Sequence, residues 1–108
     1  MWYFKVQILM YKDVDHLKKQ TNDLWRYCQF FDLELQGMGP FADSFCISLP
    51  SNPPEACMLI NALEAYFYFH DIANRMSWDD SDGPLSEGIS EIDEVFKNGE
   101  WQHRTRNS

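Results

Sequence analysis

The stretch that decides the fold is residues 66–72, which read Tyr66-Phe67-Tyr68-Phe69-His70-Asp71-Ile72. A run of aromatic residues is typical of a strand, whereas an unbroken continuation from the preceding residues is typical of a helix. No Gly or Pro separates residues 65 and 66, so we expect the helix to continue. Four consecutive aromatic side chains cannot all face inward on one helix, so at least one tyrosine should reach the surface.

Upstream of this stretch, residues 51–55 favour the start of the same helix. They read Ser51-Asn52-Pro53-Pro54-Glu55, which offers a capping side chain, a proline in the first turn and an early acid. The helix is expected to run from there toward Met76. It is apolar nearly all round from 56 to 69, which predicts burial on more than one side.

The first half of the chain predicts a strand, a helix and a hairpin. Residues 2–11 alternate with period two, which is typical of a strand with one apolar and one mixed face. Asp13 can cap an amphipathic helix over roughly 14–29. Alternation over 31–36 and 44–49, with a turn at 37–40, indicates two further strands.

The C-terminal third has weaker patterns. Residues 78–88 are typical of a loop, and an apolar stripe ending with Val95 and Phe96 predicts a short helix that stops at Asn98-Gly99. We expect one α+β domain over 1–99 and a flexible tail over 100–108. Its three-stranded antiparallel sheet packs on helices in β-α-β-β-α(-α) order. The alternative is a ferredoxin-like β-α-β-β-α-β arrangement with a fourth strand near 66–72.

Composition limits the classes of partner. The 108 residues carry a net charge of -8, and the acids are concentrated in the second half. An acidic field repels nucleic acid and anionic lipid and attracts basic proteins. The N-terminus lacks the pattern of a secretory signal, and the free thiols Cys28, Cys46 and Cys57 suit a reducing compartment. We therefore expect a cytoplasmic protein, not associated with membranes, with a basic protein as partner.

The acidic run between two tryptophans is the candidate partner-binding surface. Tryptophan is enriched in interface hot spots, and rim carboxylates steer association. The alternative interpretation is a solvated loop and the outer face of a short helix. A calcium loop aligned on Gly83 fails, because it requires ligands at Trp78 and Ile89. The predicted surface comprises Trp78, Asp79, Asp80, Asp82, Glu87, Glu91, Asp93, Glu94 and Trp101.

No motif predicts catalysis, a metal or a cofactor. His70-Asp71 lacks the further ligands that a metal centre needs, and the cysteines form no C-x-x-C pair. We expect Cys46, on the mixed strand face, to be the most reactive thiol. No Gly-rich phosphate loop or RNA-binding signature is present, so nucleic acid is not an expected ligand.

Three functional hypotheses follow. The first is a small acidic inhibitor of the immunity-protein, antitoxin or phage-encoded anti-defence type, which blocks a basic macromolecule sterically and electrostatically. The second is a homo-oligomeric structural or regulatory domain that binds a small ligand, with copies joined through Tyr3, Leu9 and Tyr11 or through the aromatic helix. The third is a small hydrolase or isomerase that uses His70 and nearby acids.

Overall fold

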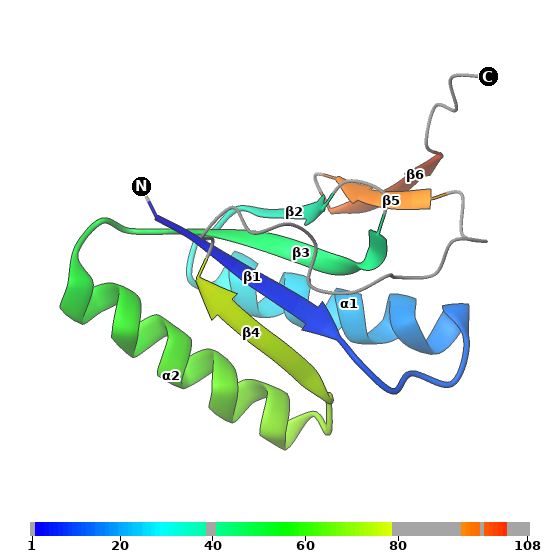
Figure 1. Cartoon of the computed structure of the whole chain (residues 1–108), viewed down its shortest axis with the longest axis horizontal. Coiled ribbons are helices and arrows are strands. Elements are labelled where there is room, and N and C mark those ends of the chain that lie inside the picture. The colour runs from blue at the N-terminus through cyan, green and yellow to red at the C-terminus, as the bar shows by residue number, and fades with distance from the viewer. Residues whose placement is uncertain (1, 39–40, 79–93, 98, 104–108) are drawn as a thin grey trace.

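The computed structural model describes residues 2–38, 41–78, 94–97 and 99–103. Over these ranges the chain is α+β, with one antiparallel sheet packed against two helices (Figure 1). In chain order the elements are β1 (Trp2–Ile8), α1 (Val14–Phe30), β2 (Leu35–Met38), β3 (Phe41–Leu49), α2 (Pro53–Phe69), β4 (Asn74–Trp78), β5 (Glu94–Lys97) and β6 (Glu100–His103).

The sheet has six strands in the order β4-β1-β3-β2-β5-β6, so the prediction of three strands is wrong. Strand β3 lies between β1 and β2 and runs antiparallel to both. Strand β4 pairs with the other edge of β1. The first six elements therefore follow the β-α-β-β-α-β order of the alternative fold, and the β5–β6 hairpin extends the sheet beyond β2.

The stretch from 66 to 72 is helical only through Phe69, so the expected continuation toward Met76 is wrong. The helix stops because Asp71 adopts a positive φ of 56°. The N–H of Ile72 then donates to the Phe67 carbonyl at 2.9 Å, and Ile72 is buried. The fourth strand is not at 66–72 but follows this cap, as β4.

Helix α1 begins and ends by the same local rules. The expected Asp13 cap is confirmed, since its carboxylate accepts the His16 N–H at 2.8 Å. At the other end Asp32 has a φ of 56°, and the N–H of Leu33 donates to the Cys28 carbonyl at 2.7 Å. Asn52 is the N-cap residue of α2, but its side chain makes no capping hydrogen bond, and Pro53 follows it.

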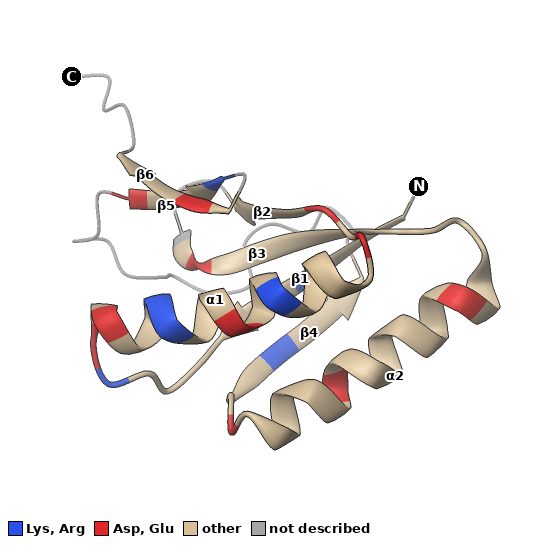
Figure 2. Ribbon diagram, turned by 180° about the vertical axis from the view of Figure 1, so that it is seen from behind, with Lys and Arg blue, Asp and Glu red and all other residues tan. Residues whose placement is uncertain are grey.

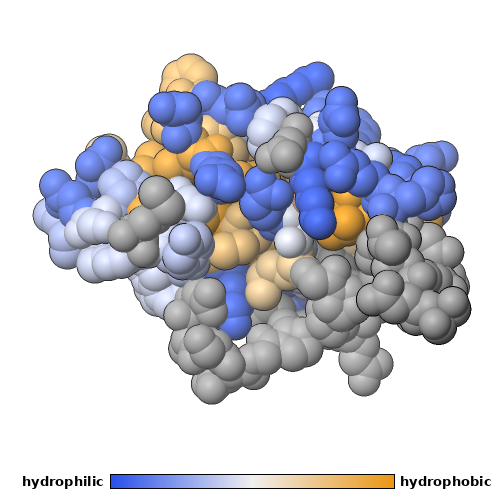
Figure 3. Space-filling model, turned by 90° about the horizontal axis from the view of Figure 1, so that it is seen from above, coloured by the Kyte–Doolittle hydropathy of each residue, from blue (hydrophilic) through white to orange (hydrophobic). Residues whose placement is uncertain are grey.

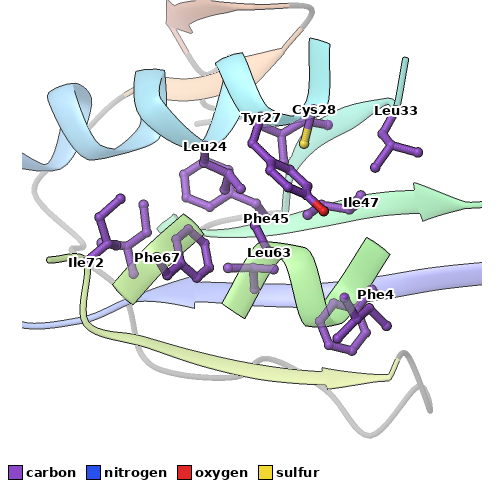
Figure 4. Close-up of a cluster of buried hydrophobic side chains, with 14 of the residues drawn as sticks. Phe4, Leu24, Tyr27, Cys28, Leu33, Phe45, Ile47, Leu63, Phe67 and Ile72 are labelled. Carbon is purple, nitrogen blue, oxygen red and sulfur yellow. The ribbon is translucent and has the colours of Figure 1, made fainter. Parts of the chain in front are cut away.

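The core lies between the helices and one face of the sheet (Figure 4). Phe4 is opposite Ile47 and Val6 is opposite Phe45, so the apolar faces of β1 and β3 are in register. Leu24 of α1 and the α2 side chains Leu63 and Phe67 pack against that surface in one buried cluster. The alternation predicted from the sequence therefore identifies which face of β1 and β3 packs against the helices.

At the C-terminal end of the expected short helix, Val95 and Phe96 lie instead in β5 and are buried. The earlier part of that expected helix lies outside the described residues. Gly99, with a φ of 83°, precedes β6 rather than ending a helix. A Cβ on Gly37 of β2 would lie 2.8 Å from the Phe96 carbonyl oxygen, so a glycine is needed for β5 to approach. Strand β6 occupies 100–103, within the range expected as a tail.

Among the described residues, no helix combines the length and the apolar character that a membrane crossing requires.

Candidate aromatic groove between the helices

Most of the predicted acidic surface lies outside the described residues: Asp79, Asp80, Asp82, Glu87, Glu91 and Asp93. Glu94 is described and forms an internal ion pair, with its two carboxylate oxygens 3.0 and 3.1 Å from Lys18 Nζ. This contact joins β5 to α1. Glu94 therefore helps to hold the C-terminal hairpin against α1.

The two tryptophans of the predicted surface lie far apart. Trp78 is on β4 and Trp101 on β6, which are the opposite edges of the sheet. Five strand spacings separate them by roughly 24 Å. Trp78 is 43% exposed and packs edge-on against Trp2 and Phe4, whereas Trp101 is half-buried against Phe96. The two rings therefore lie at opposite edges of the sheet rather than side by side.

The structure also separates the residues of the proposed oligomer face. Tyr3 is exposed near the start of β1, whereas Leu9 and Tyr11 follow the end of that strand. Tyr11 is half-buried and its hydroxyl donates to the Asp43 carboxylate at 3.0 Å. Between them, Lys5 and Gln7 are only 4% exposed, so the mixed face of β1 is not open to solvent at these two positions.

Aromatic side chains of both helices line a groove between them, and the aromatic helix was predicted as one possible contact between copies. A groove of about 550 Å³ runs between the C-terminal halves of α1 and α2. Phe30 of α1 and Phe69 of α2 are each 82% exposed. The groove is lined by Arg26, Tyr27, Phe30, Phe31, Ala62, Ala65, Tyr66 and Phe69. The expectation that a tyrosine of 66–69 reaches the surface is confirmed by Tyr68, which is exposed.

Two tyrosines connect the helices beneath this groove. The Tyr27 and Tyr66 rings are 5.3 Å apart, and the Tyr27 hydroxyl donates to the Leu59 carbonyl of α2. Burial, followed by the nearby Cys28 thiol, raises the pKa of Tyr27 to about 12. Burial and the charge of Asp23 also raise the pKa of Tyr66. Both hydroxyls therefore stay neutral at physiological pH, so these two tyrosines add no charge to the groove.

The charges around the groove are unequal. Helix α2 carries Glu55 and Glu64 and no Lys or Arg, and residues 31–74 contain no basic residue apart from histidine. Helix α1 carries both signs, with Arg26 on the groove wall. Figure 2 shows this contrast as red bands alone on α2 and mixed bands on α1. Seen from above, the surface shows apolar patches between hydrophilic side chains (Figure 3).

The groups that a hydrolase would use are loosely arranged. Asp23 Oδ2 is 3.9 Å from His70 Nδ1, beyond hydrogen-bonding distance, and 3.7 Å from Lys19 Nζ. Within the described residues, no cluster of three His, Cys, Asp or Glu side chains can hold a metal ion. Of the thiols, Cys57 is exposed, Cys46 is half-buried and Cys28 is buried.

The comparisons with known proteins found no match for this chain among family models, curated proteins or solved structures.

The groove was missed because its walls come from separate helices. Phe30 and Phe31 lie beyond the end of the helix predicted over 14–29, and Phe31 was assigned to the strand alternation over 31–36. Exposed aromatic residues at a helix end are typical of a contact surface. Only the packing of α1 against α2 places them beside Phe69.

Proposed function

We propose that this chain is a small protein-binding domain whose aromatic groove receives apolar side chains of a basic partner protein. The observation that carries the proposal is the pair Phe30 and Phe69, each 82% exposed beside an apolar groove. Large apolar side chains left in water contribute little to folding, and aromatic residues dominate binding hot spots. The groove is thus better explained by binding than by stability.

The charge of the chain supports a basic partner rather than a second copy. At a net charge of -8, two copies repel each other, whereas a basic protein is attracted at long range. The wall of the groove formed by α2 is uncharged, and Arg26 lies on the α1 wall. The charges that α2 carries outside the groove lining, Glu55 and Glu64, are both acidic. A partner that presents an apolar segment flanked by Lys or Arg therefore matches both the groove and its surroundings.

Such binding suits an inhibitor of the immunity-protein, antitoxin or anti-defence class. The domain would cover part of a basic macromolecule and exclude its other ligands. In this proposal the carboxylates of 79–93 accelerate the encounter by electrostatic steering, and the groove slows dissociation. These two contributions respond differently to salt, because exposed charges are screened and apolar contacts are not.

The test is capture from host lysate by the tagged chain, with elution in a salt gradient and identification by mass spectrometry. The groove variant is Phe30→Ser/Phe69→Ser. The matched control is Tyr3→Thr, which removes an exposed aromatic ring from β1 and keeps a strand-forming residue. We expect the wild type and the control to retain the same basic protein and the groove variant to lose it.

Two outcomes would overturn this proposal. One is equal retention of the basic protein by the groove variant. The other is recovery of the chain alone, together with a dimer in light scattering that Phe30→Ser/Phe69→Ser dissociates. That second outcome would assign the groove to contact between copies.

A further inference from the structure

A second cleft adjoins the aromatic groove on the other side of Phe69. Its volume is about 1040 Å³, and Phe69 lines both hollows. The walls are the loop after β1, the N-terminal half of α1, the C-terminal end of α2 and the turn before β4. The polar residues that line it are Lys12, His16, Gln20, Glu64, Tyr68, Asp71 and Asn74.

Gln20 is the unusual residue of this cleft. It is only 5% exposed, and its carbonyl oxygen Oε1 has no hydrogen-bond partner among the described residues. Burying a polar atom without a partner costs about 1–3 kcal/mol, and native proteins retain few such atoms. The terminal torsion of glutamine is soft, so the amide can turn toward a ligand in the cleft.

The charges of the cleft favour a cation. Two exposed carboxylates, Glu64 and Asp71, line its α2 side. Lys12 and His16 also line the cleft, and Lys12 is an exposed residue of the loop before α1. His16 Nδ1 accepts the Lys12 N–H at 2.9 Å, so Nε2 is its remaining ring nitrogen. With histidine neutral, the acids outnumber the base.

We infer that this cleft binds a guanidinium group, supplied by an arginine side chain of the basic partner. Guanidinium offers five donors in a planar fork, which suits two carboxylates and an unpaired amide carbonyl. Its flat face also stacks on aromatic rings, here those of Tyr68 and Phe69. This inference rests on the proposed function and specifies the chemistry of the partner.

The probe that tests it is N-acetylarginine methylamide, titrated into the full chain and followed by proton–nitrogen correlation spectra. The signals to follow are the side-chain amide of Gln20 and the ring of His16. The uncharged comparison is N-acetylnorleucine methylamide. We expect saturable shifts with the arginine probe and none with the norleucine probe.

The decisive variant is Glu64→Gln/Asp71→Asn, which keeps the shapes of both side chains. Asparagine tolerates the positive φ of position 71. The matched control is Glu55→Gln, an exposed acid on α2 that does not line the cleft. We expect about fivefold weaker binding in the double variant and little change in the control, as is typical of exposed charge pairs.

Three results would each overturn the guanidinium site. The first is the absence of saturable shifts at millimolar arginine probe, and the second is equal shifts with the norleucine probe. The third is equal affinity of Glu64→Gln/Asp71→Asn and the wild type for the arginine probe. These failures are distinguishable from failure of the groove. Phe30→Ser does not touch the cleft and should leave the arginine titration unchanged while it weakens capture of the partner.

Discussion

Substituting the aromatic side chains of the groove rim should leave the stability of the domain almost unchanged. Phe30 and Phe69 are 82% exposed, so each keeps less than a fifth of its surface buried. Full burial of a phenylalanine side chain is worth about 1.5–3 kcal/mol, which leaves about 0.3–0.5 kcal/mol for each position. Serine and phenylalanine have similar helix propensities, so Phe30→Ser/Phe69→Ser should cost less than about 1 kcal/mol in total.

Phe67, on the same helix as Phe69, should show a large loss of stability when it is substituted. It is 1% exposed and belongs to the core cluster. Its replacement by alanine removes buried area and leaves a cavity, which typically costs about 3–5 kcal/mol. Loss of a phenylalanine ring therefore costs much more at 67 than at 69, because one side chain belongs to the core and the other faces solvent.

The assay is urea unfolding followed by circular dichroism, with the midpoint and the slope compared between variants. Measurements at several protein concentrations show whether copies associate. A loss above about 1.5 kcal/mol for the rim variant would refute the reasoning, because it would mean that the rim is covered in solution. Concentration dependence of that loss would identify a second copy as the cover.

Three further predictions concern the buried contacts beneath the groove. Tyr27→Phe should cost about 1 kcal/mol of unfolding free energy in urea unfolding, because it deletes the hydrogen bond to Leu59, whereas Tyr68→Phe should stay within about 0.5 kcal/mol. Burial raises the pKa of Cys28 from 9.0 to about 12 and, with Cys28, that of Tyr27 from 10.0 to about 12. The folded state therefore keeps protons that the unfolded chain loses between about pH 9 and pH 12. The unfolding free energy should fall as the pH rises through this range, and the fall should be less steep in Cys28→Ala. Maleimide labelling in native buffer should modify exposed Cys57 and should reach buried Cys28 only after unfolding; equal rates would contradict the burial.

The sequence was sufficient where the determining interactions are short-range. The Asp13 cap, the amphipathic helix that follows it and the buried faces of β1 and β3 are all read from spacing. Each depends on contacts within a few residues or on a period that fixes which side chains share a face. These features were predicted with boundaries that shifted by only a few residues.

The sequence was insufficient where the structure of a segment depends on pairing with a strand that is distant in the chain. The stripe at Val95 and Phe96 suits a helix locally, yet the edge of β2 offers backbone hydrogen bonds, and Gly37 allows a strand to approach it. Likewise β4 forms because β1 has a free edge after pairing with β3. Local periodicity contains no information about an edge that exists only after the sheet has assembled.

The same distinction applies to the candidate site. The sequence by itself determined an acidic α+β domain with more aromatic side chains in its second helix than one face can bury. Only the tertiary structure decided that Phe30 and Phe69 line one groove and that Gln20 lines a cleft with Glu64 and Asp71. The physical reason is that a helix fixes the direction of its own side chains, whereas their neighbours depend on how α1 and α2 pack on the sheet.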